Sequence, residues 1–199
     1  MTTCWRTVFC CILALGLGAE SSRAVELKVS RNAIEHTLKQ QLFSGPDGRY
    51  YLKGGKQTAC SVYAEDAQLS FVQDRIIVQV KTHARLGKSV GGACLGFALS
   101  PTAEVSLEPY GEGETIGFRD AQLIKVSDRR ELNFLLGPFL SRQVPSSMQV
   151  NAADLLRKAL AGSTASSGYK VTLERLKIHS IQVQGDALIV DVDGDLSVQ

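Results

Sequence analysis

Residues with the chemistry for catalysis are few and scattered in this 199-residue chain. The three histidines, His36, His83 and His179, stand in none of the spacings that bind zinc, and we expect surface or hydrogen-bonding roles for them. The Gly-x-Ser-x-Gly and phosphate-loop patterns do not occur. The sequence therefore predicts no catalytic site, no metal site and no cofactor. A Ser–His–Asp triad stays open as an alternative, because its members can be distant in sequence.

An aspartate cluster near the end of the sequence resembles part of a calcium loop. Asp191, Asp193 and Asp195 alternate, but Gly194 is the fourth residue of the pattern, where an EF-hand loop has its glycine sixth. We interpret Asp193–Gly194 as a hairpin turn instead.

The first 24 residues have the pattern of a secretory signal. Arg6 is followed by an apolar run over 8–17 that is short for a membrane span, and Ser22 and Ala24 are the small residues of a cleavage site. We predict cleavage after Ala24, a single domain over 25–199, and a periplasmic or secreted location. An uncleaved membrane anchor is the alternative.

Two cysteines, Cys60 and Cys94, lie outside this segment. An even pair in an oxidising compartment predicts one disulfide bond. A bond that closes a loop of this length stabilises a fold by about 3–4 kcal/mol. Two buried free thiols are the alternative.

The spacing of apolar residues predicts the elements that must position these groups. Ser30 is a candidate N-cap for an amphipathic helix over 31–43. Alternation predicts strands over 25–29, 68–72, 75–84, 103–108, 116–126, 176–183 and 188–192, with turns at 73–74, 111–114 and 184–186. The glycine-rich segment 87–96 is expected to be a loop or bulge.

Two further helices are expected between the strands. One covers 128–142, is bent at Pro138 and is closed by Pro145. Asn151 with Asp154 opens a shorter one to about residue 160, and a Ser/Gly-rich loop follows over 162–168.

Runs of strands that are separate from runs of helices indicate an α+β fold. The apolar face of the antiparallel strands must be buried, and the amphipathic helices are the available cover. The net charge of +2 is ordinary and gives no reason to expect a nucleic-acid partner. The apolar stripe over 132–140 is broad for one helix, so a groove that accepts an acyl chain is one interpretation and a plain core is the other.

The layout resembles a known group of exported proteins. The resemblance lies in four segments of the sequence: 27–42, 64–69, 135–140 and 183–188. These segments are similar to those of the YceB-like (DUF1439) proteins, which are related in shape to the tubular lipid-binding (TULIP) superfamily. This chain differs by lacking a lipoprotein cysteine and by having the Cys60/Cys94 pair.

The resemblance implies a curled antiparallel β-sheet wrapped around the amphipathic helices, as in one half of a TULIP domain. It also implies an apolar cavity between sheet and helices and no catalytic residues. It leads us to expect a non-catalytic periplasmic binding or carrier protein for a lipid or other hydrophobic small molecule, in contact with the envelope membrane. The expected lining residues are Leu38, Leu42, Ile76, Val78, Val80, Val105, Leu135, Phe139 and Leu140. The alternatives are an envelope protein–protein interaction or assembly module with a filled core, and an undetected hydrolase.

Overall fold

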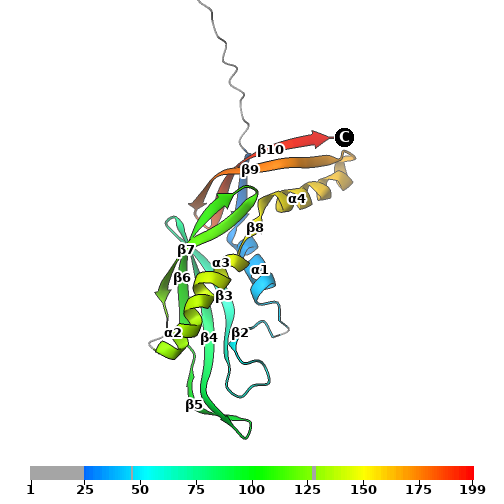
Figure 1. Ribbon diagram of the computed structural model, residues 1–199. Coiled ribbons are helices and arrows are strands. Elements are labelled where there is room, and N and C mark those ends of the chain that lie inside the picture. The colour runs from blue at the N-terminus through cyan, green and yellow to red at the C-terminus, as the bar shows by residue number, and fades with distance from the viewer. Residues whose placement is uncertain (1–24, 46, 127–128) are drawn as a thin grey trace, which may run out of the picture.

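The computed structural model describes residues 25–45, 47–126 and 129–199, with no side-chain description for 162–167. The expected signal segment, with Cys4, Cys10 and Cys11, lies outside these residues. The described chain is mostly antiparallel strand with a few helices, an α+β fold with a curled sheet (Figure 1).

The larger sheet has seven strands in the order β2-β3-β4-β6-β7-β8, with β5 also paired to β4. The bounds of these strands are β2 Tyr50–Lys53, β3 Val62–Val72, β4 Arg75–Val90, β5 Ala93–Leu99, β6 Thr102–Glu112, β7 Thr115–Lys125 and β8 Val150–Asn151. A smaller sheet has the order β1-β10-β9, formed by β1 Val25–Ser30, β9 Val171–Gln184 and β10 Ala187–Val198. In Figure 1 the small sheet and the β4–β5 hairpin lie at opposite ends of the molecule.

Helices cover one face of the larger sheet and part of the smaller one. Helix α1 (Arg31–Leu42) packs on β3, and the helical path α2 (Arg130–Pro138), η1 (Phe139–Gln143) and α3 (Val144–Ser147) packs on β2, β6 and β7. Helix α4 (Ala152–Ser167) packs on β9. One hydrophobic core joins both sheets and these helices. None of the described helices has both the length and the apolarity of a membrane span.

The predicted alternation in β4 is confirmed. Ile76, Val78 and Val80 are fully buried, whereas Gln79 and Lys81 between and beyond them are exposed. Val105 is likewise buried on β6 and pairs with Val78. Period two therefore assigns the core face of these strands correctly, because successive side chains of a strand point to opposite faces.

The predicted caps are also confirmed. The Ser30 side chain accepts a hydrogen bond from the backbone N–H of Ala33, and the Asn151 side chain accepts one from Asp154 at 2.9 Å. Helix α4 nevertheless runs to Ser167, so the expected end near residue 160 and the loop over 162–168 are wrong. Helix-forming alanines around Gly162 outweigh its propensity to break a helix.

The expected bend after Pro138 takes the form of a π-helix, η1, which begins at the next residue. Pro145 does not close the helical path. It lies in the first turn of α3, where a missing backbone N–H is tolerated. The helical path therefore continues to Ser147 instead of ending at 142.

The loop or bulge expected over 87–96 and the turn expected at Asp193–Gly194 are wrong, because strands take up most of the first segment and all of the second. Residues 87–96 form the end of a β4–β5 hairpin around Gly91 and Gly92, whose positive φ angles suit a two-residue turn. Asp193 and Gly194 lie inside β10 and pair with Lys177 and Leu176 of β9. The turn between those strands is at 185–186, as expected from 184–186.

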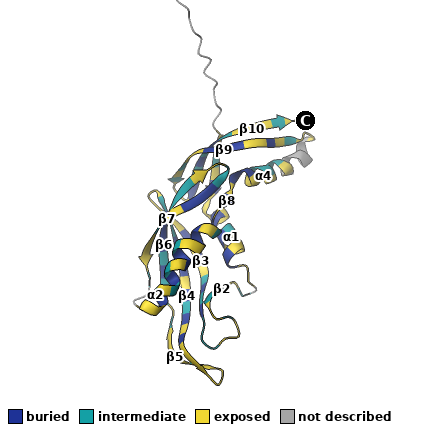
Figure 2. Ribbon diagram, in the orientation of Figure 1, coloured by how far each residue is buried: buried dark blue, intermediate teal, exposed yellow. Residues whose placement is uncertain are grey.

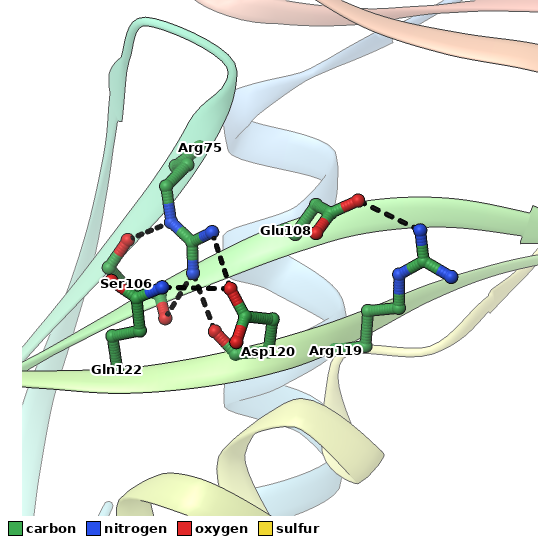
Figure 3. A network of polar contacts seen from close by, with 6 residues as sticks. All are labelled: Arg75, Ser106, Glu108, Arg119, Asp120 and Gln122. Carbon is green, nitrogen blue, oxygen red and sulfur yellow. Dashed lines mark hydrogen bonds and ion pairs between the residues drawn. The ribbon is translucent and has the colours of Figure 1, made fainter.

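Cations from β4 hold two of the register shifts in the larger sheet. Asp66 and Asp120 have positive φ angles at register shifts in β3 and β7. Arg75 donates to the Asp120 carboxylate at 2.9 Å and also to its backbone carbonyl (Figure 3). Lys81 pairs with Asp66. Aspartate tolerates the left-handed conformation better than most residues, and each cation fixes the aspartate that adopts it.

Candidate functional site

The structure brings the nine predicted lining residues together. Eight of them are buried, and Leu135 is half-buried against the same core. The Phe139 ring stacks on Tyr50, with 5.0 Å between ring centroids, and joins η1 to the sheet edge. Four pockets at the surface of the described chain, of about 280 to 640 Å³, are lined by other residues. The nine form the contact between sheet and helices, and a ligand cavity among them stays a prediction.

The apolar face of the sheet continues beyond its helical cover onto the β4–β5 hairpin. Leu86 pairs with Phe97 and Lys88 with Leu95, so these four side chains share the face of the core residues of β4. Val90, Leu95 and Phe97 are 49%, 60% and 37% exposed. The guanidinium of Arg129, just before α2, lies 5.3 Å from the Phe97 ring centroid and marks where the cover ends.

The exposed hairpin lies at one end of the molecule (Figures 1 and 2). We call residues 53–61 and 85–100 together the hairpin end. The sequence of the hairpin end contains no aspartate or glutamate. It contains four exposed basic residues, Lys53, Lys56, Arg85 and Lys88. Apolar side chains next to uncompensated positive charge fit the surface of an anionic amphiphile.

The predicted disulfide is confirmed and fastens the hairpin end. Cys60, just before β3, bonds to Cys94 of β5 with a Cα–Cα distance of 5.0 Å. Close backbone contact adds to this restraint, since a Cβ atom on Gly87 would lie 2.0 Å from the carbonyl oxygen of Leu95. The disulfide bond and the close contact at Gly87 therefore hold β5 against the end of β4, although few side chains of this strand pair are buried.

The opposite face of the same strands carries a polar cluster centred on Glu65. Its carboxylate accepts from Arg49 Nε at 3.0 Å and lies 2.9 Å from His83 Nε2. Tyr63 stacks on the His83 ring, and the Arg49 guanidinium lies 4.3 Å from the Tyr63 ring centroid. The bond to Glu65 raises the pKa of Arg49 well above its usual range. These contacts fix Arg49 in one position.

Ser100 completes a hydroxyl–imidazole–carboxylate series with two residues of this cluster. Its Oγ lies 3.1 Å from His83 Nδ1, and the other ring nitrogen faces Glu65. Acyl-transfer triads use the same three groups, but they place the hydroxyl at Nε2 and the carboxylate at Nδ1, the reverse of the arrangement here. Sequence reasoning identified His83 as an outward-facing residue but missed the two neighbours. The pairing of Tyr63 with His83 brings Glu65 close to the imidazole. From the sequence, strand alternation predicts only that these side chains point outward from the core, and it does not predict that they meet.

The other two histidines have separate surroundings. His179 of β9 lies 2.5 Å from the Asp193 carboxylate on the adjacent strand, and Asp195 pairs with Arg175. His36 lines a pocket of about 570 Å³ between α1 and α4, together with polar residues such as Gln40, Asn151 and Lys158. In the described part of the chain, no three His, Cys, Asp or Glu side chains are placed to hold a metal ion.

Comparisons with known proteins give little guidance. No family model and no curated protein sequence matches the chain, so membership in the YceB-like group stays a prediction. Among solved structures, the chain is similar to the crystal structure of lipopolysaccharide binding protein, at 13% identity and a TM-score of 0.32. The match covers 86% of this chain and 50% of that chain, so this chain spans about half of the other protein's length. A likeness this distant assigns neither a fold family nor a ligand.

Proposed function

We propose that this protein is a non-catalytic binding protein for a lipid or other hydrophobic ligand, exported to the periplasm or secreted after cleavage behind Ala24. One observation carries the proposal: an apolar sheet face extends past its helical cover, with Val90, Leu95 and Phe97 exposed and Lys88 paired with Leu95 on the same face. Isolated exposed apolar residues are normal, but a contiguous patch of them indicates a binding surface.

The energies of this surface suit reversible binding. Burying the exposed part of each of the three apolar side chains contributes on the order of 1 kcal/mol. Lys88, which pairs with Leu95 on the same face, adds about 1 kcal/mol at an anionic surface. These increments sum to several kcal/mol, which corresponds to dissociation constants between about millimolar and micromolar. Such affinities are those of a carrier or a peripheral contact with the envelope membrane.

The proposed ligand has two alternative binding positions, one at the surface and one between sheet and helices. A ligand held at the surface contacts only the hairpin end. An acyl chain that enters between sheet and helices contacts the nine core residues, among them Leu38, Val78 and Phe139. Entry requires the helices to separate from the sheet, because these three side chains are buried.

Titration with a fluorescent, uncharged acylglycerol tests the proposal. We expect saturable binding to the wild-type protein and roughly tenfold weaker binding after Leu95→Ser with Phe97→Ser, a loss of about 1.4 kcal/mol. Phe134→Ser is the matched control, because this side chain is exposed on α2. Lack of probe uptake, together with no lipid in native mass spectra of the protein purified from its own envelope, would contradict the proposal.

A protein–protein interaction or assembly module with a filled core is the second candidate. The fully buried core favours it, since Leu132, Leu136 and Leu140 on successive turns of the helical path are all inaccessible to solvent. Crosslinking through a cysteine introduced at Leu95 separates the two functions. Specific capture of one envelope protein, without any lipid binding, would support the module.

A further inference from the structure

A second pocket lies on the face of the hairpin end opposite the apolar patch. It has a volume of about 410 Å³ and is lined by β2 and the loop that follows it, by β3, β4 and β5, and by the connection from β5 to β6. Its lining residues are Arg49, Tyr51, Gly55, Lys56, Thr58, Ser61, Tyr63, His83, Ala84, Arg85, Ala98, Leu99 and Ser100. This volume lies within the usual range of small-ligand sites.

The charged residues that line the pocket are basic. Arg49, Lys56 and Arg85 are its basic residues, and its lining includes no carboxylate. The two nearest acidic groups are already engaged: Glu65 binds Arg49 and His83, and Asp47 accepts from Tyr51 at 2.8 Å. The hydrogen bond from Tyr51 lowers the pKa of Asp47, so this carboxylate stays ionised and bound to the tyrosine.

The other two cations of the pocket have no competing partner. Among the described residues, no side-chain hydrogen bond or ion pair engages the Lys56 ammonium or the Arg85 guanidinium. The Ser61 hydroxyl lies in the same lining and adds a hydrogen-bond donor. The Thr58 hydroxyl already donates to the Gly55 carbonyl oxygen at 2.7 Å, and the Ser100 hydroxyl lies 3.1 Å from His83 Nδ1. A guanidinium, an ammonium and a hydroxyl in one lining form a donor set that recognises phosphate oxygens.

We propose that this pocket binds a phosphate monoester or diester. The inference rests on the proposed function when the phosphate belongs to a lipid headgroup, and a soluble phosphate ester offers the same chemistry. Arg49, fixed by Glu65 and Tyr63, forms the rigid side of the site. Lys56 and Arg85 close on the anion from the other side.

The test is a titration of isotope-labelled protein with inorganic phosphate and with glycerol phosphate, followed by NMR. We expect saturable shifts of the amides of Gly55, Thr58, Tyr63, Arg85 and Ser100. Lys56→Gln with Arg85→Gln should weaken binding at least about tenfold. Arg142→Gln, an exposed cation on η1, is the matched control. Shifts that are absent, or equal in the double variant, would overturn the proposal.

Vesicles distinguish the two sources of the phosphate. Stronger binding to vesicles that contain phosphatidic acid than to soluble esters supports a lipid headgroup. Binding to soluble esters without that gain supports a soluble ester in the same pocket. Because the acylglycerol probe has no phosphate, its continued binding in a protein that fails to bind phosphate would refute the pocket and leave the proposed function intact.

Discussion

Strand β4 passes through two different environments, and the contrast between them underlies the proposed function. Residues 75–84 pair with β3 and β6 and bury every second side chain under helices. Residues 85–90 pair only with β5, and their apolar face is largely open to water. The first half is held by burial, and the second by a disulfide and close backbone contact. The protein therefore keeps apolar surface exposed without relying on a core beneath it.

The largest expected effect tests the covered half. Leu136→Ala removes a side chain with no exposed surface and leaves a cavity, so we expect a loss of about 2–5 kcal/mol in the free energy of unfolding. Leu95→Ala in the uncovered half should change it by about 0.5 kcal/mol or less. Denaturant titrations of both variants measure the difference. Equal losses would mean that the hairpin face is packed against something in the native protein.

Removal of the disulfide should have the next largest effect. We expect the Cys60→Ala, Cys94→Ala variant to lose about 2–4 kcal/mol of stability. Amide hydrogen exchange should accelerate mainly in β5 and in the adjoining end of β4, because β3 and β6 still hold residues 75–84. Uniform acceleration over the whole of β4 would show that the two halves unfold as one unit.

Glycine substitutions should act with opposite sign in the two regions. At Gly96 an added Cβ would lie 2.0 Å from the carbonyl oxygen of Leu86, and we expect Gly96→Ala to cost about 1–3 kcal/mol. At Gly137 in α2 an added Cβ meets no atom within 4 Å, and Gly137→Ala should stabilise by up to about 1 kcal/mol. Thermal unfolding of both variants measures the sign and size of each change in stability. A neutral Gly96→Ala would mean that the hairpin strands are free to separate.

The smallest effect concerns acid stability at the register shifts in β3 and β7. The hydrogen bond from Arg75 lowers the pKa of Asp120, and the hydrogen bond from Lys81 lowers that of Asp66. The unfolded chain therefore binds these protons more readily. The stabilisation is complete above about pH 4 and is lost as the pH falls through the folded-state pKa. Asp120→Asn should flatten the fall of stability below pH 4, and an unchanged slope would contradict this assignment.

The sequence by itself determined the local structure and the core face. The alternation around Val78 and Val105, the caps at Ser30 and Asn151, and the cysteine pair were all predictable. Each depends on neighbours in sequence or on residue type, and period two is fixed by the geometry of a strand. The glycine-rich segment 87–96 was interpreted wrongly because its strand pairing depends on a close approach of two backbones, which no local pattern encodes.

Only the tertiary structure decided which apolar face lacks a cover and which polar groups meet. Alternation shows that Leu95 and Phe97 share a face. Helix α2 begins only after Arg129, which contacts Phe97, so it leaves this face uncovered, and that depends on packing. Glu65, His83 and Ser100 meet because strand register and the connection from β5 to β6 bring distant segments together. Contacts of this kind arise from pairing between strands, and a single strand's sequence does not specify its partner.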